Sequence, residues 1–283
     1  MARYQRGWAG LILCLMVGFP LETVADTGLR VQIVGSTTVL PVASRSAQKF
    51  MQSSKVRIIA NAGGSGVGIH SVAQSRADIG MASREISPDE KIRFEKSNLI
   101  THPVGLDAVA CMVSAEIYQA GVRHLTRREI AGIYMGKIRN WKEVGGPDRE
   151  IVVIDKERHR GTRHVFMNYI FGNALQRTPG TLLVTGSNNE EQTKIAQSDS
   201  AIGMLSFAWI NEQVKAVTLR DQGKEYLPTW KAVQQREYPI VRKLNFITAG
   251  EPRGEVKAFI DFVKGPEGQK IIEESGYIPI GGN

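Results

Sequence analysis

Short β-type runs alternate with helical runs along this chain of 283 residues, and this alternation limits the folds open to it more than any other feature. Residues 29–34, 56–60 and 79–82 are short apolar runs of the kind that form buried strands. After Pro41 and again after Gly66, apolar residues recur at helical spacing. Further strands are predicted at residues 151–154, 201–205 and 244–248. Strands that alternate with helices predict α/β layers with largely parallel sheets.

The length of the chain favours two lobes, because a single compact core seldom grows far past about 250 residues. Residues 104–114 form a long apolar stretch that could cross from one lobe to the other. The strand at 244–248 could return to the first lobe. Residues 256–263 then carry the apolar face of a final helix, which Gly265 and Pro266 are expected to stop.

The first 25 residues have the pattern of an export signal. Arg3 and Arg6 precede an uncharged apolar run at 8–19, and small residues end it, so that cleavage is expected near Ala25. The run is shorter than the roughly 20 apolar residues that span a bilayer, although an uncleaved membrane anchor remains the alternative. Cys14 follows a leucine where a lipid-attachment motif requires a small residue, which argues against lipidation.

Cleavage would leave Cys111 as the one cysteine of the exported chain, so no disulfide could form within it. Cys111 lies in an apolar run and is predicted to be a small buried core residue.

The net charge of +8 is compatible with an anionic ligand. Nucleic-acid-binding proteins cluster their basic residues on one element, often among aromatic residues. Here the basic residues are spread along the chain and aromatic residues make up 7% of it, so we expect no nucleic-acid partner.

Three loops share one design, in which a strand ends in glycine and hydroxyl residues and a helix begins at once. They lie at residues 35–38, 63–66 and 160–162. A helix N-terminus exposes unpaired backbone N–H groups and the positive end of the helix dipole, and glycine allows an anion to approach the backbone. Each loop alone could be an ordinary helix cap. Three that converge on one cleft would enclose a tetrahedral anion.

Catalytic and metal-binding patterns are missing from the sequence. The glycine loops lack the lysine of nucleotide-binding loops, and no nucleophile elbow is present. Ser36, Ser65 and Ser83 have no base partner by motif. His159 and His164 are five residues apart, a poor spacing for a metal on one helix face. The sequence therefore predicts no enzyme, no metal site and no cofactor.

Several segments resemble those of a known family, the phosphate-binding proteins of phosphate ABC transporters, called the PstS-like group. The resemblance runs from about Val31 to Ile280. The matching segments are Gly-Ser-Thr-Thr-Val-Leu-Pro at 35–41, Gly-Gly-Ser-Gly-Val-Gly-Ile at 63–69, Ala-Asp-Ile-Gly-Met-Ala-Ser-Arg-Glu at 77–85, the turn at 136–146, and the segments 201–204 and 266–270.

The resemblance implies a type II periplasmic-binding-protein-like fold, with mixed sheets flanked by helices and a two-strand hinge. Lobe 1 would comprise residues 26–107 and 238–283, lobe 2 residues 108–237, and residues 1–25 the signal peptide. The protein would be a periplasmic monomer that closes on inorganic phosphate and delivers it to the permease subunits of an ABC transporter.

The resemblance also implies binding residues. The first loop would offer the Thr38 hydroxyl and the Val39 N–H, with Thr37 as a close alternative. The second would offer Ser65 and the Gly66 N–H, and the third Ser83 or Arg84. Some relatives carry an aspartate at the Arg84 position, where it accepts a proton from the bound phosphate. This chain therefore lacks that acceptor for selecting phosphate over sulfate.

The second lobe departs from the family pattern Arg-x-x-Gly-Ser-Gly-Thr-Arg at residues 156–163. Lys156 replaces an arginine, which keeps the charge and loses the bidentate fork. Arg160 replaces a serine and either reaches the anion or points outward, while Gly161 and Thr162 are intact. Lys156, Arg84 and Arg160 are expected to balance the anion's charge.

These departures leave three other functions open. The ligand could be sulfate, molybdate or tungstate instead of phosphate. The chain could be a homologue kept for signalling or adhesion. A secreted phosphatase is the enzyme alternative, although it would need a metal cluster or an activated nucleophile.

Overall fold

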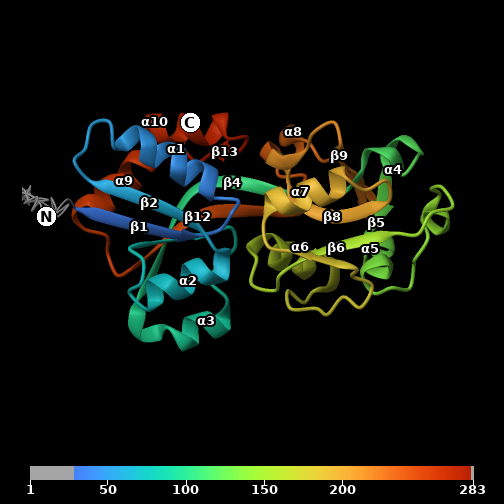
Figure 1. The fold of residues 1–283 in the computed structure, drawn as a ribbon, viewed down its shortest axis with the longest axis horizontal. Helices are drawn as coiled ribbons and strands as arrows, with labels where there is room; N and C mark the ends of the chain where they lie inside the picture. The colour runs from blue at the N-terminus through green and yellow to red at the C-terminus, as the bar shows by residue number, and fades with distance from the viewer. Residues whose placement is uncertain (1–28, 282–283) are drawn as a thin grey trace, which may run out of the picture.

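The computed structural model describes residues 29–281, which form two lobes side by side (Figure 1). The expected signal peptide and Cys14 lie outside the described residues. Along residues 29–281, no helix is both long and apolar enough to cross a membrane.

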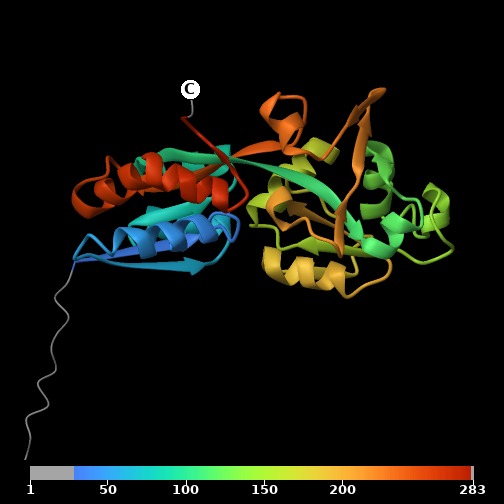
Figure 2. The ribbon, with the colours of Figure 1, turned by 90° about the horizontal axis from the view of Figure 1, so that it is seen from above.

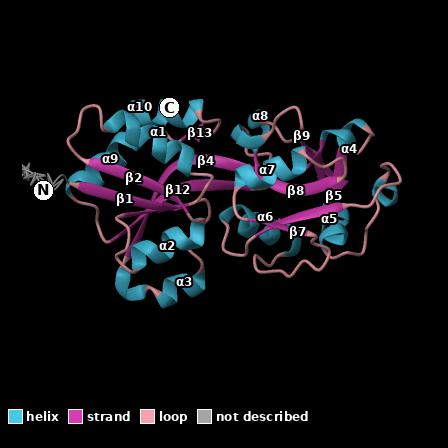
Figure 3. Ribbon diagram, in the orientation of Figure 1, coloured by secondary structure: helices cyan, strands magenta, loops and turns pink. Residues whose placement is uncertain are grey.

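Lobe 1 is built around the first strands of the chain and its last helices. Its elements are β1 (Arg30–Gly35), α1 (Leu40–Phe50), β2 (Arg57–Ala62), α2 (Ser65–Ala73), β3 (Ile79–Ala82), α3 (Pro88–Arg93), the 3-10 helix η1 (Glu95–Ser97), α9 (Gly254–Lys264), α10 (Pro266–Glu274) and β13 (Ile278–Pro279). The strands run between α1, α9 and α10 on one side and α2 and α3 on the other (Figure 3).

Lobe 2 is built from the middle of the chain. Its helices are α4 (Ala115–Gln119), α5 (Arg127–Tyr134), α6 (Gly161–Phe171), α7 (Asn188–Ala196), α8 (Trp230–Gln234) and the 3-10 helices η2 (Trp141–Val144) and η3 (Phe207–Trp209). Its strands are β5 (His124–Thr126), β6 (Val152–Lys156), β7 (Leu183–Thr185), β8 (Ala201–Ser206), β9 (Val214–Ala216), β10 (Thr218–Asp221) and β11 (Lys224–Tyr226).

Two long strands, β4 (Leu99–Ser114) and β12 (Val241–Ala249), run from one lobe to the other (Figure 2). β12 pairs antiparallel with residues 99–108 of β4, and the two strands lie in the middle of a mixed sheet of order β2-β1-β3-β12-β4-β8-β6-β7. The predicted α/β layers and the two-strand connection are therefore confirmed. The predicted boundary at residue 107 falls within β4 and the one at residue 238 lies just before β12, and both stay predictions.

Each lobe has its own hydrophobic core. The lobe 1 core packs Phe246 of β12 against Phe259 of α9, with ring centroids 5.8 Å apart. The lobe 2 core includes the fully buried Tyr134 and Trp141. Cys111 is buried there as predicted, and burial raises the pKa of its thiol.

The prediction for the C-terminal region was incomplete. The helix over 256–263 does end at Lys264, but it is not the final helix, because Pro266 begins a second one, α10. Proline is well suited to the first turn of a helix, because the N–H that it lacks would have no partner there.

Candidate functional site

Four helices, two from each lobe, begin at one small enclosed cavity on the seam between the lobes. The helices are α1 and α2 of lobe 1 and α6 and α7 of lobe 2. The cavity is lined by Ser36, Thr37, Thr38, Gly64, Ser65, Ser83, Lys156, Arg160, Gly161, Thr162, Ser187 and Asn188. Its volume of about 10 Å³ is room for about one water molecule in this closed arrangement of the lobes. Such a site suits an inorganic anion, because helix N-termini create a positive potential there.

The lobe 1 wall is held together by close backbone contacts that require glycine. Gly35 ends β1 with a positive φ of 143°, and an added Cβ would lie 2.2 Å from the Met81 carbonyl oxygen. The Gly35 carbonyl accepts hydrogen bonds from the N–H groups of Gly63 and Gly64, both at 2.8 Å. The Ser36 N–H donates to the Met81 carbonyl at 2.9 Å. These bonds fix the loops after β1, β2 and β3 beside one another.

Three serines form a chain of hydroxyl groups along this wall. Ser36 Oγ donates to Ser83 Oγ at 2.9 Å, and Ser83 Oγ lies 3.4 Å from Ser65 Oγ. The Ser83 N–H donates to Ser65 Oγ at 3.0 Å. All three side chains are buried, and no acidic side chain takes part in the chain.

The lobe 2 wall begins where β6 ends. Lys156 is buried and pairs with the buried Glu191 of α7, and its Nζ also donates to the Ser187 carbonyl at 3.3 Å. Burial lowers the pKa of Lys156 and raises the pKa of Glu191, and each charge opposes the other's shift. Gly161 then opens α6 directly against lobe 1, where an added Cβ would lie 2.3 Å from Ser65 Oγ.

The sequence analysis did not find one part of the cavity and one residue next to it. The first is the N-terminus of α7, where Ser187 accepts a hydrogen bond from the Glu190 N–H at 3.1 Å. Asn188 Nδ2 reaches across the seam and donates to Thr38 Oγ1 at 2.9 Å. Serine followed three residues later by glutamate is a helix-start signature, so this signal was present in the sequence.

The missed neighbour is Arg242 of β12, which contacts two residues of the lining. Its side chain donates to Thr38 Oγ1 at 3.2 Å and to Thr162 Oγ1 at 3.0 Å, so it contacts both lobes. It pairs with Asp107 of β4, its direct partner in the strand register. A charged residue in an apolar strand is seldom fully buried without a partner, and Asp107 within the apolar stretch 104–114 was the available signal.

Comparison with known proteins agrees with this geometry. Residues 22–267 match a family model described as PBP superfamily domain. The phosphate-binding protein PstS of Bacillus subtilis (strain 168) is 33% identical over 250 residues, which cover 88% of this chain and 80% of that protein. The chain belongs to the PstS-like family.

Solved structures of PstS-like proteins share the fold. A protein of Clostridium perfringens, solved with bound phosphate, has a TM-score of 0.79 and 31% identity, over 89% of this chain and all (100%) of that one. An ABC-type phosphate transport receptor from Vibrio cholerae has a TM-score of 0.71 and 29% identity, over 88% of this chain and 100% of the receptor. The predicted periplasmic-binding-protein-like fold is thereby confirmed.

Most residues that the PstS-like resemblance singled out do line the cavity. They are Thr37, Thr38, Ser65, Ser83, Lys156, Arg160, Gly161 and Thr162. Val39 and Gly66 do not line it, and their N–H groups are already bonded: Val39 donates to the Ser36 carbonyl and Gly66 to the His159 carbonyl, both at 3.1 Å.

Arg84, the residue where some relatives carry an acid, faces a different space. It lines an open groove along the seam together with His159 and His164, and its guanidinium is held by Glu90 at 2.6 and 2.7 Å. Its Nε is buried without a hydrogen-bond partner. Burial, together with the Arg84 charge, lowers the pKa of His164 to about 4. Glu90 neutralises Arg84 locally, so Arg84 adds little charge to the cavity.

Arg160 lines the cavity but is also paired. Its Nε donates to Glu157 at 2.7 Å, and its side chain crosses the seam to lie against Gly64 of lobe 1. The lining itself contains no aspartate or glutamate. Each cation close to the cavity therefore has a carboxylate of its own outside it, and hydroxyl and N–H dipoles provide the attraction for an anion.

Within residues 29–281, no group of three or more histidine, cysteine or acidic side chains could hold a metal ion.

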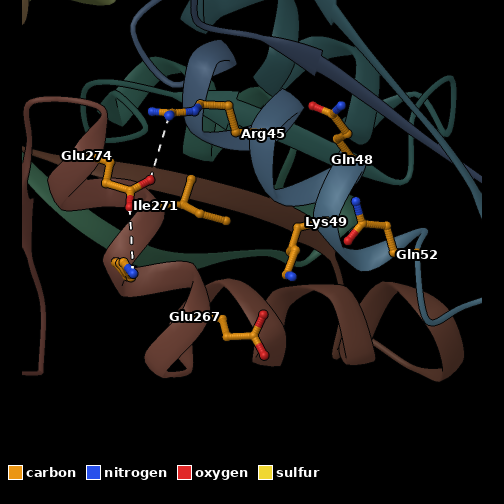
Figure 4. A pocket seen from close by; sticks show the side chains of 8 residues that line it. Arg45, Gln48, Lys49, Gln52, Glu267, Ile271 and Glu274 are labelled. Atoms are coloured by element: carbon orange, nitrogen blue, oxygen red, sulfur yellow. Dashed lines mark ion pairs between the residues drawn. The ribbon is translucent and has the colours of Figure 1, made fainter.

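A groove between α1 and α10 of lobe 1 is lined by Arg45, Lys49, Glu267 and Glu274, among others (Figure 4). Glu274 pairs with the half-exposed Arg45 at 3.6 Å. This groove is open and carries mixed charge, so it lacks the convergent donors of the seam cavity.

Proposed function

We propose that this protein captures inorganic phosphate in the seam cavity and releases it by opening its two lobes, without catalysing a reaction. The observation that carries the proposal is the meeting of four helix N-termini, from both lobes, on a cavity lined by hydroxyl groups. Membership of the PstS-like family supports phosphate as the anion and a transport receptor as the role.

The proposed binding residues divide between the lobes. Thr37, Thr38, Ser65 and Ser83 would act from lobe 1, and Lys156, Arg160, Gly161 and Thr162 from lobe 2, joined by Ser187 and Asn188. Because both lobes supply donors, the anion would stabilise the closed form, and the two connecting strands would act as the hinge.

The same proposal covers location and partner. We infer that the protein works outside the cytoplasmic membrane, in the periplasm, and passes phosphate to the permease of an ABC transporter as a monomer. The export pattern of residues 1–25 and the names of the relatives support this role.

A second candidate is a receptor for another oxyanion such as sulfate. The lining without a carboxylate favours it, because no fixed acceptor is present to demand a protonated ligand.

Calorimetry on the purified protein with phosphate, sulfate, arsenate, molybdate and tungstate tests both candidates. We expect phosphate to bind with a Kd well below millimolar and to raise the free energy of unfolding by about 2.7 kcal/mol at 100 times the Kd. Thr162→Val should weaken binding, while the exposed Asn168→Ala on the same helix should not. Phosphate binding only in the millimolar range would reject the main proposal, and tighter binding of sulfate would favour the second.

A further inference from the structure

Thr38 Oγ1 already receives two hydrogen bonds from the protein. Arg242 Nη2 donates to it at 3.2 Å from the hinge strand, and Asn188 Nδ2 donates to it at 2.9 Å from lobe 2. A hydroxyl group has two acceptor lone pairs and one O–H donor. Both lone pairs are therefore occupied, and donation is the role left to Thr38. Within residues 29–281, the acceptor within reach of that proton is Thr162 Oγ1 at 3.5 Å, a long contact.

Arg242 itself has no freedom to contact a ligand. Its five N–H groups all have acceptors: Nε and Nη2 donate to Asp107 Oδ2 at 2.8 and 2.7 Å, and the others to Thr38, Thr162 and the Ser83 carbonyl. An arginine side chain keeps its proton in proteins, so this donor pattern does not reverse with pH. Arg242 thus acts on an anion through the threonines.

The serine wall, formed by Ser36, Ser65 and Ser83, can accept hydrogen bonds as well as donate them. Ser36 Oγ accepts one hydrogen bond, from the Thr38 N–H at 3.2 Å, and Ser65 Oγ accepts one directed bond, from the Ser83 N–H. Ser36 Oγ keeps a lone pair that could accept a hydrogen bond from a protonated ligand oxygen, and Ser65 Oγ keeps one when its own hydroxyl donates to Ser83. The cavity therefore has one side that can only donate, at Thr38, and one side that can also accept.

We propose that Arg242 is the positioning residue of the anion site, which makes the Thr38 hydroxyl an obligatory donor and holds Thr162 beside it. This inference rests on the proposed function. A protonated oxygen of phosphate would then lie against the serine wall, and an unprotonated oxygen would accept the hydrogen bond from Thr38. Thr38 lies on lobe 1 and Asn188 and Thr162 on lobe 2, so the arrangement is complete in the closed form.

A double-mutant cycle on phosphate affinity tests the inference. In the wild-type background, Thr38→Val should weaken binding about 10- to 100-fold, the usual range for a hydrogen bond to a charged group. Arg242→Lys keeps a positive charge beside Asp107 but replaces the fork that reaches both lobes. In the Arg242→Lys background, Thr38→Val should weaken phosphate binding less than about threefold, because Arg242 no longer orients the Thr38 hydroxyl.

Ser65→Ala is the matched control, since Ser65 lines the same cavity and has no bond to Arg242. Its effect should be equal in both backgrounds. Equal effects of Thr38→Val in both backgrounds would overturn the inference and leave the proposed function intact. Loss of phosphate binding by the wild-type protein would instead reject the function.

A crystal structure of the wild-type protein with phosphate is an independent test, even if Arg242→Lys does not fold. We expect Thr38 Oγ1 within about 3 Å of a phosphate oxygen, with Arg242 still bonded to Thr38 and Asp107. Direct coordination of phosphate by Arg242 would contradict the positioning role.

Discussion

Arg242 and Asp107 form a buried ion pair that joins the two strands between the lobes, with Arg242 Nη2 2.7 Å from Asp107 Oδ2. The two residues are direct partners in the antiparallel register of β12 and β4. Asp107 also accepts a hydrogen bond from Ser206 Oγ of lobe 2 at 2.6 Å. The pair therefore connects the two strands to the cavity through Arg242 and to lobe 2 through Asp107.

Removal of one partner from this pair should destabilise the whole protein. Asp107→Ala leaves the Arg242 charge buried and uncompensated, so we expect the free energy of unfolding to fall by about 3–5 kcal/mol. Urea denaturation followed by circular dichroism measures the change. As a control, Asp261→Ala breaks the exposed pair with Lys257 and should cost no more than about 0.5 kcal/mol. Similar small losses for both variants would show that the buried pair is not structural.

Closure of the lobes should depend on the absence of a side chain at Gly161. An alanine Cβ there would lie 2.3 Å from Ser65 Oγ and 2.6 Å from Ser83 Oγ, both in the opposite lobe. We expect Gly161→Ala to weaken phosphate binding about 5- to 150-fold, the equivalent of about 1–3 kcal/mol of overpacking. Calorimetry gives the affinity, and thermal unfolding without phosphate should change little. Unaltered affinity would mean that the lobes do not approach this closely around the ligand.

Much of the cavity could be predicted because its loops follow strands and carry local signals. Glycine and hydroxyl residues at 35–38, 63–66 and 160–162 mark helix starts by themselves. The direction of the Arg84 side chain could not be predicted in the same way, because it depends on Glu90, six residues further along. Arg242 depends on the register of two strands more than 100 residues apart, which no local pattern fixes.

We expect this protein to discriminate only weakly between phosphate and sulfate. Strong rejection of a close analogue requires a buried polar group that the analogue leaves unpaired. The lining has hydroxyl groups that can rotate and no carboxylate, so either anion can be satisfied at the serine wall. We expect sulfate to bind within about 100-fold of phosphate, and competition calorimetry measures the ratio. Arsenate, which carries the same proton as phosphate, is the control and should bind about as tightly. Discrimination beyond about 10⁴-fold would point to a fixed acceptor in the cavity.

His164 should make the stability of the protein fall in mild acid. It is half-buried at the start of α6, and its pKa drops from 6.5 to about 4 because of burial first and the charge of Arg84 second, with Arg163 adding to the effect and Glu90 opposing it. The folded state thus binds fewer protons at this site than the unfolded state between these two pH values. Stability is therefore fully present above about pH 6.5 and is lost as the pH falls towards about 4. Once solvent screening of a half-buried group is allowed for, the loss should be about 1–2 kcal/mol.

Urea denaturation of the His164→Gln variant at several pH values between about 7 and 4 measures this contribution. The variant should lose less stability than the wild-type protein over that range, because the proton that opposes folding has no site to bind. The exposed His124→Gln serves as the control and should follow the wild-type curve. Parallel curves for all three proteins would show that His164 takes up its proton as readily in the folded chain as in the unfolded one.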